Sequence, residues 1–466
     1  MTGATVTDVR AIGTTSGPSA RERIRSWRSQ DRVRVPSSTA GLPPGPRTPL
    51  PLQTFRYWSA REKYLPGLHE RYGDTFTLRV APAGCVIVLR NPDHIREIFR
   101  GDPDVFHAGE GNALPKPLVG ARSVLTLDAP DHKAERRRMM PPFHGERIAA
   151  VASLMAEAAE REVAGWPLDR EFPLLERTHQ LTLDIIVRVV LGVDDAGRAA
   201  ELGQALRTVL AFPLHQLAMW LWPDLDRFGP WRRAVRDLDR ADALIYAEIE
   251  RRRRDPNRGE RPDVLSMLLA GDPDSNLVRD ELVTLLVAGH ETTAVGLAWT
   301  FERLLRHPAA LARTRDGLDD PADPYLTAVV KESLRVRPVI FNIARRLTQP
   351  VDLAGYHLPA GLLLLPSIGA VHSDPRIWGA DVADFRPQRW LESTPPPNHA
   401  WLPFGGGTRR CLGAAFAQTE METVVRTVLQ HVDLVADRRE DEGTKMHGVT
   451  VNPARGARVR VLRRLR

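Results

Sequence analysis

A long apolar stretch at residues 275–308 limits what this chain can fold into. It reads SNLVRDELVTLLVAGHETTAVGLAWTFERLLRHP, and apolar side chains surround its middle on nearly every face. A helix of that length would be roughly 50 Å long and would cross the whole molecule. Because a helix that is apolar all round must be buried, the rest of the chain is expected to pack around it.

The remaining sequence predicts a mainly α fold with a small β region, an α+β class. Apolar residues recur at three- and four-residue steps over 129–315, which is the spacing of helices. Further helices are expected at 323–337 and from about 412 to 431. Short apolar runs at 75–89, 351–375 and 457–465, separated by Gly and Pro, are typical of strands.

We expect one domain over 41–466, preceded by a disordered basic arm at 1–40. The arm is rich in Ser, Thr, Gly and Arg, and it lacks the apolar core of a signal peptide or membrane anchor. A transit peptide fits this composition, but Asp8 and Asp31 count against it. Two cysteines in 466 residues exclude a disulfide framework and suit a cytoplasmic location.

One of those cysteines, Cys411, lies in the segment FGGGTRRCLG among glycines and arginines. No histidine base and no further zinc ligand accompany it in this segment, so it does not resemble a catalytic cysteine or a zinc site. One thiolate is enough to bind haem iron, because the porphyrin supplies the other ligands. A helix start near Leu412 would lower the pKa of the thiol. Taken alone, a free cysteine is more often a buried structural residue.

Four segments in order resemble the cytochrome P-450 family. FGGGTRRCLG fits the haem-binding signature F-x-x-G-x-R-x-C-x-G at every fixed position. KESLR at 331–335 resembles the family's E-x-x-R, and FRPQRW at 385–390 resembles the segment whose arginine completes a network with it. AGHETT at 288–293 resembles the oxygen-binding segment of the long central helix. The resemblance covers about 41–462 and implies a P-450 fold with the long helix over a haem.

The resemblance implies a haem-thiolate monooxygenase with haem b as its cofactor. Cys411 would be the axial iron ligand, Thr292 and Glu291 would deliver protons to iron-bound oxygen, and Gly289 would leave space for oxygen. His290 occupies a variable position and is not expected to be a ligand. Glu332, Arg335 and Arg389 would fix the fold without catalysing. The residues expected to hold or line the haem are His132, Arg136, Ala288, Gly289, Arg345 (with Arg346 as the alternative), Phe404, Gly405, Arg409, Cys411 and Gly413.

The expected partners are a lipophilic small molecule, O2, and a ferredoxin-type electron donor with its reductase. Apolar segments at 210–229 and 339–344 favour a terpene, fatty acid, steroid or polyketide, without choosing among them. The net charge of +7 suits an acidic ferredoxin, and the basic face is expected at Arg136, Arg137, Arg138, Arg409 and Arg410. A monomer without a membrane span is expected, and no nucleic-acid motif is present. A peroxide-driven oxidant and a non-catalytic haem or ligand carrier stay open as alternatives.

Overall fold

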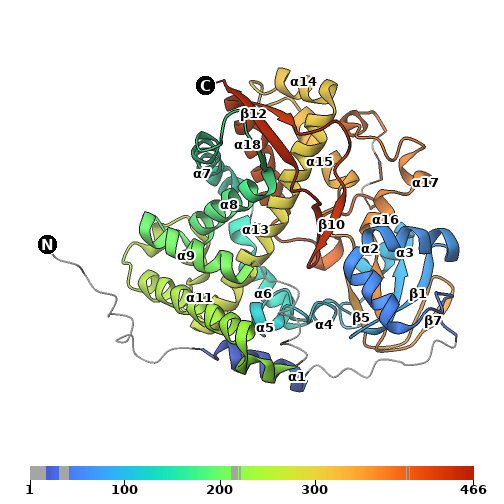
Figure 1. The fold of residues 1–466 in the computed structure, drawn as a ribbon. Coiled ribbons are helices and arrows are strands. Elements are labelled where there is room, and N and C mark those ends of the chain that lie inside the picture. The colour runs from blue at the N-terminus through green and yellow to red at the C-terminus, as the bar shows by residue number, and fades with distance from the viewer. Residues whose placement is uncertain are drawn as a thin grey trace.

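The computed structural model describes residues 17–30, 41–143, 145–210, 219, 222–394, 396–397 and 399–465. Helices form most of the molecule, as the sequence predicted (Figure 1). They are α1 (Ala20–Gln30), α2 (Leu50–Tyr72), α3 (Pro92–Arg100), α4 (Ala108–Gly111), α5 (Lys116–Val119), α6 (Asp131–Met139), α7 (Gly145–Ala164), α8 (Leu174–Ile186), α9 (Ala196–Leu210), α11 (Gly229–Arg253), α12 (Val264–Leu268), α13 (Ser275–Arg306), α14 (Pro308–Asp316), α15 (Tyr325–Val336), α16 (Ile368–His372), α17 (Pro375–Trp378) and α18 (Ala414–His431).

The strands form small sheets, which confirms the predicted α+β class. The strands are β1 (Thr75–Val80), β2 (Gly84–Leu89), β3 (Phe106–His107), β4 (Glu171–Pro173), β5 (Arg345–Leu347), β6 (Val351–Leu353), β7 (Tyr356–Leu358), β8 (Leu363–Pro366), β9 (Val432–Ala436), β10 (Thr444–His447), β11 (Thr450–Pro453) and β12 (Arg458–Arg464). The largest sheet has the order β1-β2-β8-β5-β3 and lies with α2 and α3 on one side of the molecule (Figure 1).

The predicted strand region at 351–375 contains one error. Strands β6, β7 and β8 form there, but its end folds into the short helix α16, where Gly369 packs against the Phe341 ring. All five residues of α16 are buried. The spacing of apolar residues cannot distinguish a strand from a helix when a short run is buried on every side.

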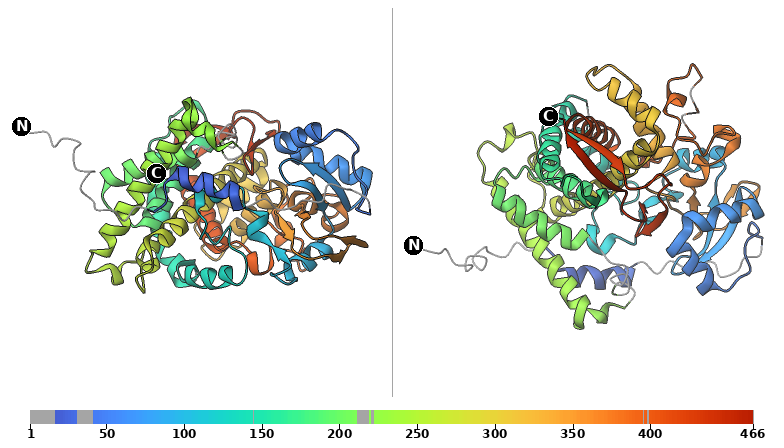
Figure 2. Two further views of the ribbon diagram at one scale, coloured as in Figure 1. Left: turned by 90° about the horizontal axis from the view of Figure 1, so that it is seen from below. Right: turned by 45° about the horizontal axis from the view of Figure 1, so that its top comes forward.

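Helix α13 is the long central helix that the sequence predicted. Its side chains are buried along most of its length, and it packs against α8, α15, α18 and β11. Figure 2 shows it passing through the interior between the helical body and the sheets. Among the described residues, only α13 has the length and hydropathy of a membrane span, and 72% of its most apolar window is buried in the protein. Its apolar character therefore serves the core.

The prediction of a disordered arm is wrong for residues 17–30, because α1 packs on the helical body. Ile24 is buried, and the Arg23 guanidinium lies 2.6 Å from the carboxylate of Asp242 on α11. Ser19 and Glu22 form a capping box, in which each side chain accepts a backbone N–H of the other. That S-x-x-E pattern was the available sequence signal, but the polar composition of the arm concealed it. Residues 1–16 and 31–40 lie outside the described residues.

Candidate functional site

The segment around Cys411 forms a tight loop before α18. The backbone N–H of Cys411 donates to the carbonyl of Phe404 at 2.8 Å and closes the loop. Gly405 and Gly407 have left-handed backbone conformations, with φ of 66° and 67°. Residues other than glycine rarely adopt this conformation. Helix α18 begins at Ala414, two residues later than predicted.

The glycines of this loop approach protein atoms rather than open space. A Cβ on Gly407 would lie 1.9 Å from the Phe99 carbonyl oxygen, and one on Gly406 would lie 2.3 Å from the Phe99 ring. Phe99 lies in α3. Close packing of the loop against α3 therefore requires these two glycines.

Cys411 is exposed, yet many protein atoms surround it. Burial raises the pKa of its thiol, and the N–H of Gly413 and the charges of Arg136 and Arg410 only partly oppose this. The expected lowering of the pKa is therefore not found in the protein alone. The sulfur is thus accessible to solvent, although its surroundings disfavour the charged thiolate.

Four basic side chains that the sequence predicted to bind the haem lie close enough for their charges to interact, and the charge of Arg136 also reaches Cys411. His132 and Arg345 are buried, while Arg136 and Arg409 are partly buried. Burial and the charge of Arg409 lower the pKa of Arg345 to about 10, and burial with the charges of Arg409 and Arg136 lowers that of His132 to about 4. Such a shift is the sign of positive charge enclosed without enough negative charge.

Asp128 is the carboxylate that partly balances this cluster, and sequence reasoning missed it. It accepts a hydrogen bond from the guanidinium of Arg409 at 2.8 Å and from the backbone N–H groups of Gly109 and Glu110. Arg409 also donates to the carbonyls of Val124 and Leu127. Since one carboxylate faces several guanidiniums, the cluster fits a further dianionic group, and the two propionates of a haem meet that requirement.

The geometry distinguishes Arg345 from Arg346. Arg345 lies close enough to Arg409 and His132 for their charges to interact, and it packs over the Phe99 ring. Arg346 donates to the carbonyl of Gly361 at 2.7 Å. Arg345 therefore belongs to the basic cluster, although nothing in the sequence separated these neighbours.

Thr292 and Gly289 lie on α13 as predicted, but each has a local structural role. The Thr292 hydroxyl is exposed and donates to the carbonyl of Ala288 at 2.6 Å. A Cβ on Gly289 would lie 2.4 Å from Cδ1 of Ile186 on α8. Gly289 therefore allows α13 and α8 to pack closely, and its expected role of leaving space for oxygen stays a prediction.

Histidines surround Glu291, and the sequence did not predict them. Nε2 of His179 on α8 lies 3.0 Å from Glu291 Oε2, and Nδ1 of His447 on β10 lies 3.3 Å from Oε1. Burial would raise the pKa of this carboxyl, but contacts with the two histidines outweigh it and lower the pKa strongly. His290 is buried with Nδ1 3.0 Å from the Thr182 hydroxyl, and burial lowers its pKa to about 4. It is not part of the Glu291 cluster of ion pairs.

The predicted Glu332 network is present and buried. The carboxylate accepts two hydrogen bonds from Arg335, at 2.9 and 2.7 Å, and one from the Trp390 indole at 3.0 Å. Arg389 approaches Glu332 at 3.5 Å. Helix α15 is thereby joined to the segment around residues 382–390.

The basic face contains fewer exposed arginines in the structure than the sequence predicted. Arg137 and Arg410 are exposed. Arg138 instead donates to Glu135 and to the Leu268 carbonyl, and it pairs with the buried Glu281. Of the five expected arginines, Arg138 and Arg409 are thus used inside the protein.

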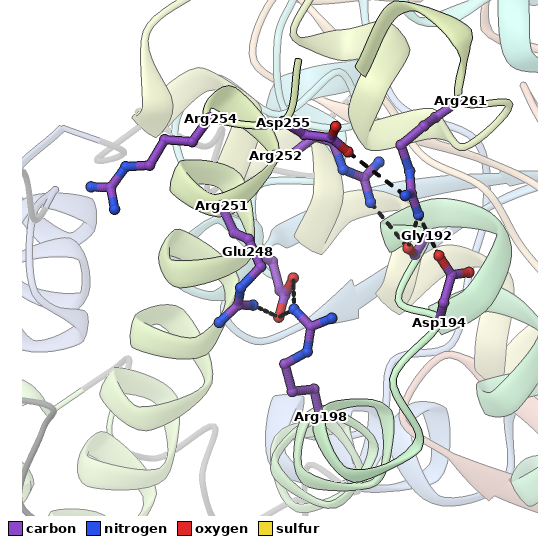
Figure 3. Close-up of a pocket in the computed structure, with 9 residues that line it drawn as sticks. All are labelled: Gly192, Asp194, Arg198, Glu248, Arg251, Arg252, Arg254, Asp255 and Arg261. Carbon is purple, nitrogen blue, oxygen red and sulfur yellow. Dashed lines mark hydrogen bonds and ion pairs between the residues drawn. The ribbon is translucent and has the colours of Figure 1, made fainter. Parts of the chain in front are cut away.

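An open pocket of about 390 Å³ between α9 and α11 lies apart from the predicted residues (Figure 3). Several of its arginines are paired with acids: Arg198 and Arg251 share Glu248, and Arg261 contacts Asp194. The pairs stabilise the turn after α8, and none of the predicted site residues lines this pocket. Its lining is Gly192, Asp194, Arg198, Glu248, Arg251, Arg252, Arg254, Asp255 and Arg261.

Glu420 on α18 is a buried carboxyl that sequence reasoning also missed. Its Oε1 has no hydrogen-bond partner among the described residues, and burial raises its pKa well above the ordinary value. The folded protein therefore holds this proton up to a higher pH than the unfolded chain does.

The Glu420→Gln variant is expected to gain stability over the native protein as pH rises. Above the ordinary pKa of 4.5 and below the raised folded pKa, the native protein loses about 1.4 kcal/mol per pH unit through this group, because only the folded state holds the proton. Glutamine removes that loss. Denaturant unfolding at pH 5, 6 and 7 measures the difference, and Glu440→Gln at an exposed position is the control. Parallel pH curves for native protein and Glu420→Gln would contradict the assignment.

Known proteins resemble this chain over nearly its whole length. The family model described as Cytochrome P-450 matches residues 43–461. Cytochrome P-450 135B1 of Mycobacterium tuberculosis is 43% identical over 438 residues, which cover 91% of this chain and 92% of that protein. Cytochrome P-450 135A1 of the same organism is 38% identical over 432 residues (91% and 96%), and cytochrome P-450 138 of Mycobacterium bovis is 37% identical over 436 residues (91% and 97%). The chain belongs to the cytochrome P-450 family of haem monooxygenases.

Proposed function

We propose that the chain uses haem b, held through Cys411, to oxidise a lipophilic small molecule with O2 and two electrons from a ferredoxin. The observation that carries this proposal is the enclosed positive charge beside an exposed but desolvated cysteine sulfur. A cytoplasmic monomer is proposed with it.

The chain's own residues would hold the cofactor from several elements. When bound, haem supplies the iron at which O2 is reduced and the substrate oxidised. Cys411 would bind the iron, and Phe404, Gly405 and Gly413 would shape the loop around it. His132, Arg136, Arg345 and Arg409 would bind the propionates, with Asp128 orienting Arg409.

Thr292 and Glu291 are proposed to move protons at the opposite side of the site. The Thr292 hydroxyl donates to its own helix in the structure, so a change of rotamer or a bound water must redirect it. Glu291 is held as a carboxylate and can accept a proton from its histidine neighbours.

The substrate pocket is proposed to be apolar, with Leu285 and Ala288 of α13 and the neighbouring Ile340 and Ile343 in its wall. Phe341 was also expected there, but it is buried against Gly369 and the large sheet. The aromatic segment at 211–221 falls outside the described residues apart from Met219. The wall supports a lipophilic ligand without naming one.

Thr292→Ala is expected to divert reducing equivalents from product to hydrogen peroxide. Loss of a positioned proton donor costs roughly 100-fold or more in such steps. The measurement uses a lipophilic compound selected by its effect on the haem spectrum, with a ferredoxin, its reductase and NADPH, and it compares product with peroxide. Thr300→Ala is the matched control, since its hydroxyl also donates to its own helix, at 2.8 Å to Gly296. Unchanged coupling in Thr292→Ala would favour the peroxide-driven alternative.

A further inference from the structure

The Glu291 carboxylate joins α13 to two elements that are distant in sequence. On one side it contacts His179 of α8. On the other, Oε1 contacts three side chains of the β10–β11 hairpin, namely His447, Thr450 and Asn452, at 3.3, 3.2 and 3.4 Å. A carboxylate next to Thr292 is therefore connected to a hairpin whose first strand, β10, is partly exposed.

The partners of Glu291 differ in their access to solvent. Thr450 and Asn452 are buried and cannot exchange protons near neutral pH. The side chains of His179 and His447 are 29% and 46% exposed, against 22% for Glu291. His447 directs Nδ1 at Glu291, and its ring is the most exposed of the groups that contact the carboxylate. An imidazole in that position can take a proton on one nitrogen and give up another from the second.

We propose that His447 is a positioning residue that supplies protons from solvent to Glu291, on the basis of the role proposed for Glu291 above. The contact between its Nδ1 and Glu291 Oε1, together with its half-exposed ring, carries this inference. His179 holds the other carboxylate oxygen, which fixes the direction of Oε1 toward the hairpin.

The transfer moves one proton and no electrons. Nδ1–H of protonated His447 gives its proton to Oε1 of Glu291, which leaves a neutral ring and a neutral carboxyl. The neutral ring keeps its remaining proton on Nε2. Tautomer exchange through solvent moves that proton to Nδ1, and Nε2 then takes a proton from solvent, which returns the ring to its charged form. The Glu291 carboxyl passes its proton toward Thr292 and becomes a carboxylate again.

The charged groups around His447 favour its protonated form at neutral pH. The hydrogen bond with Glu291 raises the pKa of His447 above the ordinary 6.5, against burial and the charge of Lys445 on the same strand. Two residues of α2 contact the same hairpin: Arg61 donates to the Gly448 carbonyl, and Glu62 accepts from Thr444. His179 lies on the opposite side of the Glu291 carboxylate. Since a raised pKa keeps the ring charged up to higher pH, the proton supply is expected to fall only above that pKa.

The first measurement is the NMR titration of His447 in the full, haem-loaded protein. The ring is expected to titrate above 6.5, and Glu291→Gln is expected to return it toward the ordinary value because the carboxylate is lost. A titration that Glu291→Gln does not change would overturn the proposal, since the pair would not exist in solution.

The second measurement separates proton supply from structure. His447→Asn keeps an N–H near the position of Nδ1 but cannot titrate, so a purely structural role predicts native behaviour. We expect instead a fall of about 10-fold in product formation with the ferredoxin system, and loss of the native pH dependence between pH 6 and 9. The matched control is His357→Asn, whose Nδ1 lies 2.8 Å from Asp352 on an exposed hairpin.

The outcomes distinguish this inference from the proposed function. A native rate and pH profile in His447→Asn, with product lost in Glu291→Gln and Thr292→Ala, would overturn the role of His447 alone. Native coupling in Glu291→Gln and Thr292→Ala would overturn the proposed function and this inference with it.

Discussion

Cys411→Ala is expected to abolish O2-dependent oxidation and to remove the thiolate signature from the absorption spectrum of the reduced protein with carbon monoxide. Changes to residues that merely orient a metal ligand cost 10–100-fold, so loss of the proposed ligand itself should exceed about 100-fold. The loop itself should persist, because its closing bond joins backbone atoms of Cys411 and Phe404. The spectrum therefore tests the iron–sulfur bond apart from the fold.

Cys85→Ala is the control for this prediction. Cys85 is buried on β2 within the apolar cluster beside α3, and burial raises the pKa of its thiol. Its replacement should cost about 1 kcal/mol of stability and leave the spectrum unchanged. An unchanged spectrum in Cys411→Ala, or a changed one in Cys85→Ala, would show that the cysteine assignment is wrong.

Features coded by neighbouring residues could be predicted from the sequence. The length and apolar character of α13 follow from one continuous segment, and so do the hairpin of β1 and β2 and the Cys411 loop. Such features depend on spacing within about thirty residues, and spacing is what a single sequence displays. The resemblance to the P-450 family also depended on motifs within single segments, and on their order along the chain.

Features that depend on contacts between distant segments could not be predicted. Asp128 meets Arg409 across 281 positions, and His447 meets Glu291 across 156. Asp128 does not share a motif with Arg409, and His447 does not share one with Glu291. Periodicity and composition therefore contain no signal for either pair. The close packing of Gly289 on Ile186 and of Gly407 on Phe99 was missed for the same reason, since these pairs become neighbours only in the fold.

The E-x-x-R motif predicts that Glu332 and Arg335 interact, but the contribution of this pair to the stability of the protein depends on how deeply it is buried. Glu332 and Arg335 are fully buried, and Arg335 also donates to the carbonyls of Val382 and Asp384. It reaches the carbonyl of His372 as well, and His372 Nε2 accepts the backbone N–H of Leu402, two residues before Phe404. The hydrogen bonds thus continue from α15 to the start of the Cys411 loop.

Glu332→Ala is therefore expected to destabilise the protein by about 3–5 kcal/mol, because it leaves the Arg335 charge buried without its partner. With a total stability of roughly 5–15 kcal/mol, such a loss should leave little folded protein able to bind haem. Denaturant unfolding and haem content per chain measure the two effects. Glu171→Ala removes an acid that lies 3.8 Å from Arg458 at the surface, and it should cost at most about 1 kcal/mol. Equal losses in the two variants would show that the network adds no more than a surface pair, and the loop would then be fixed by the packing of its glycines against α3.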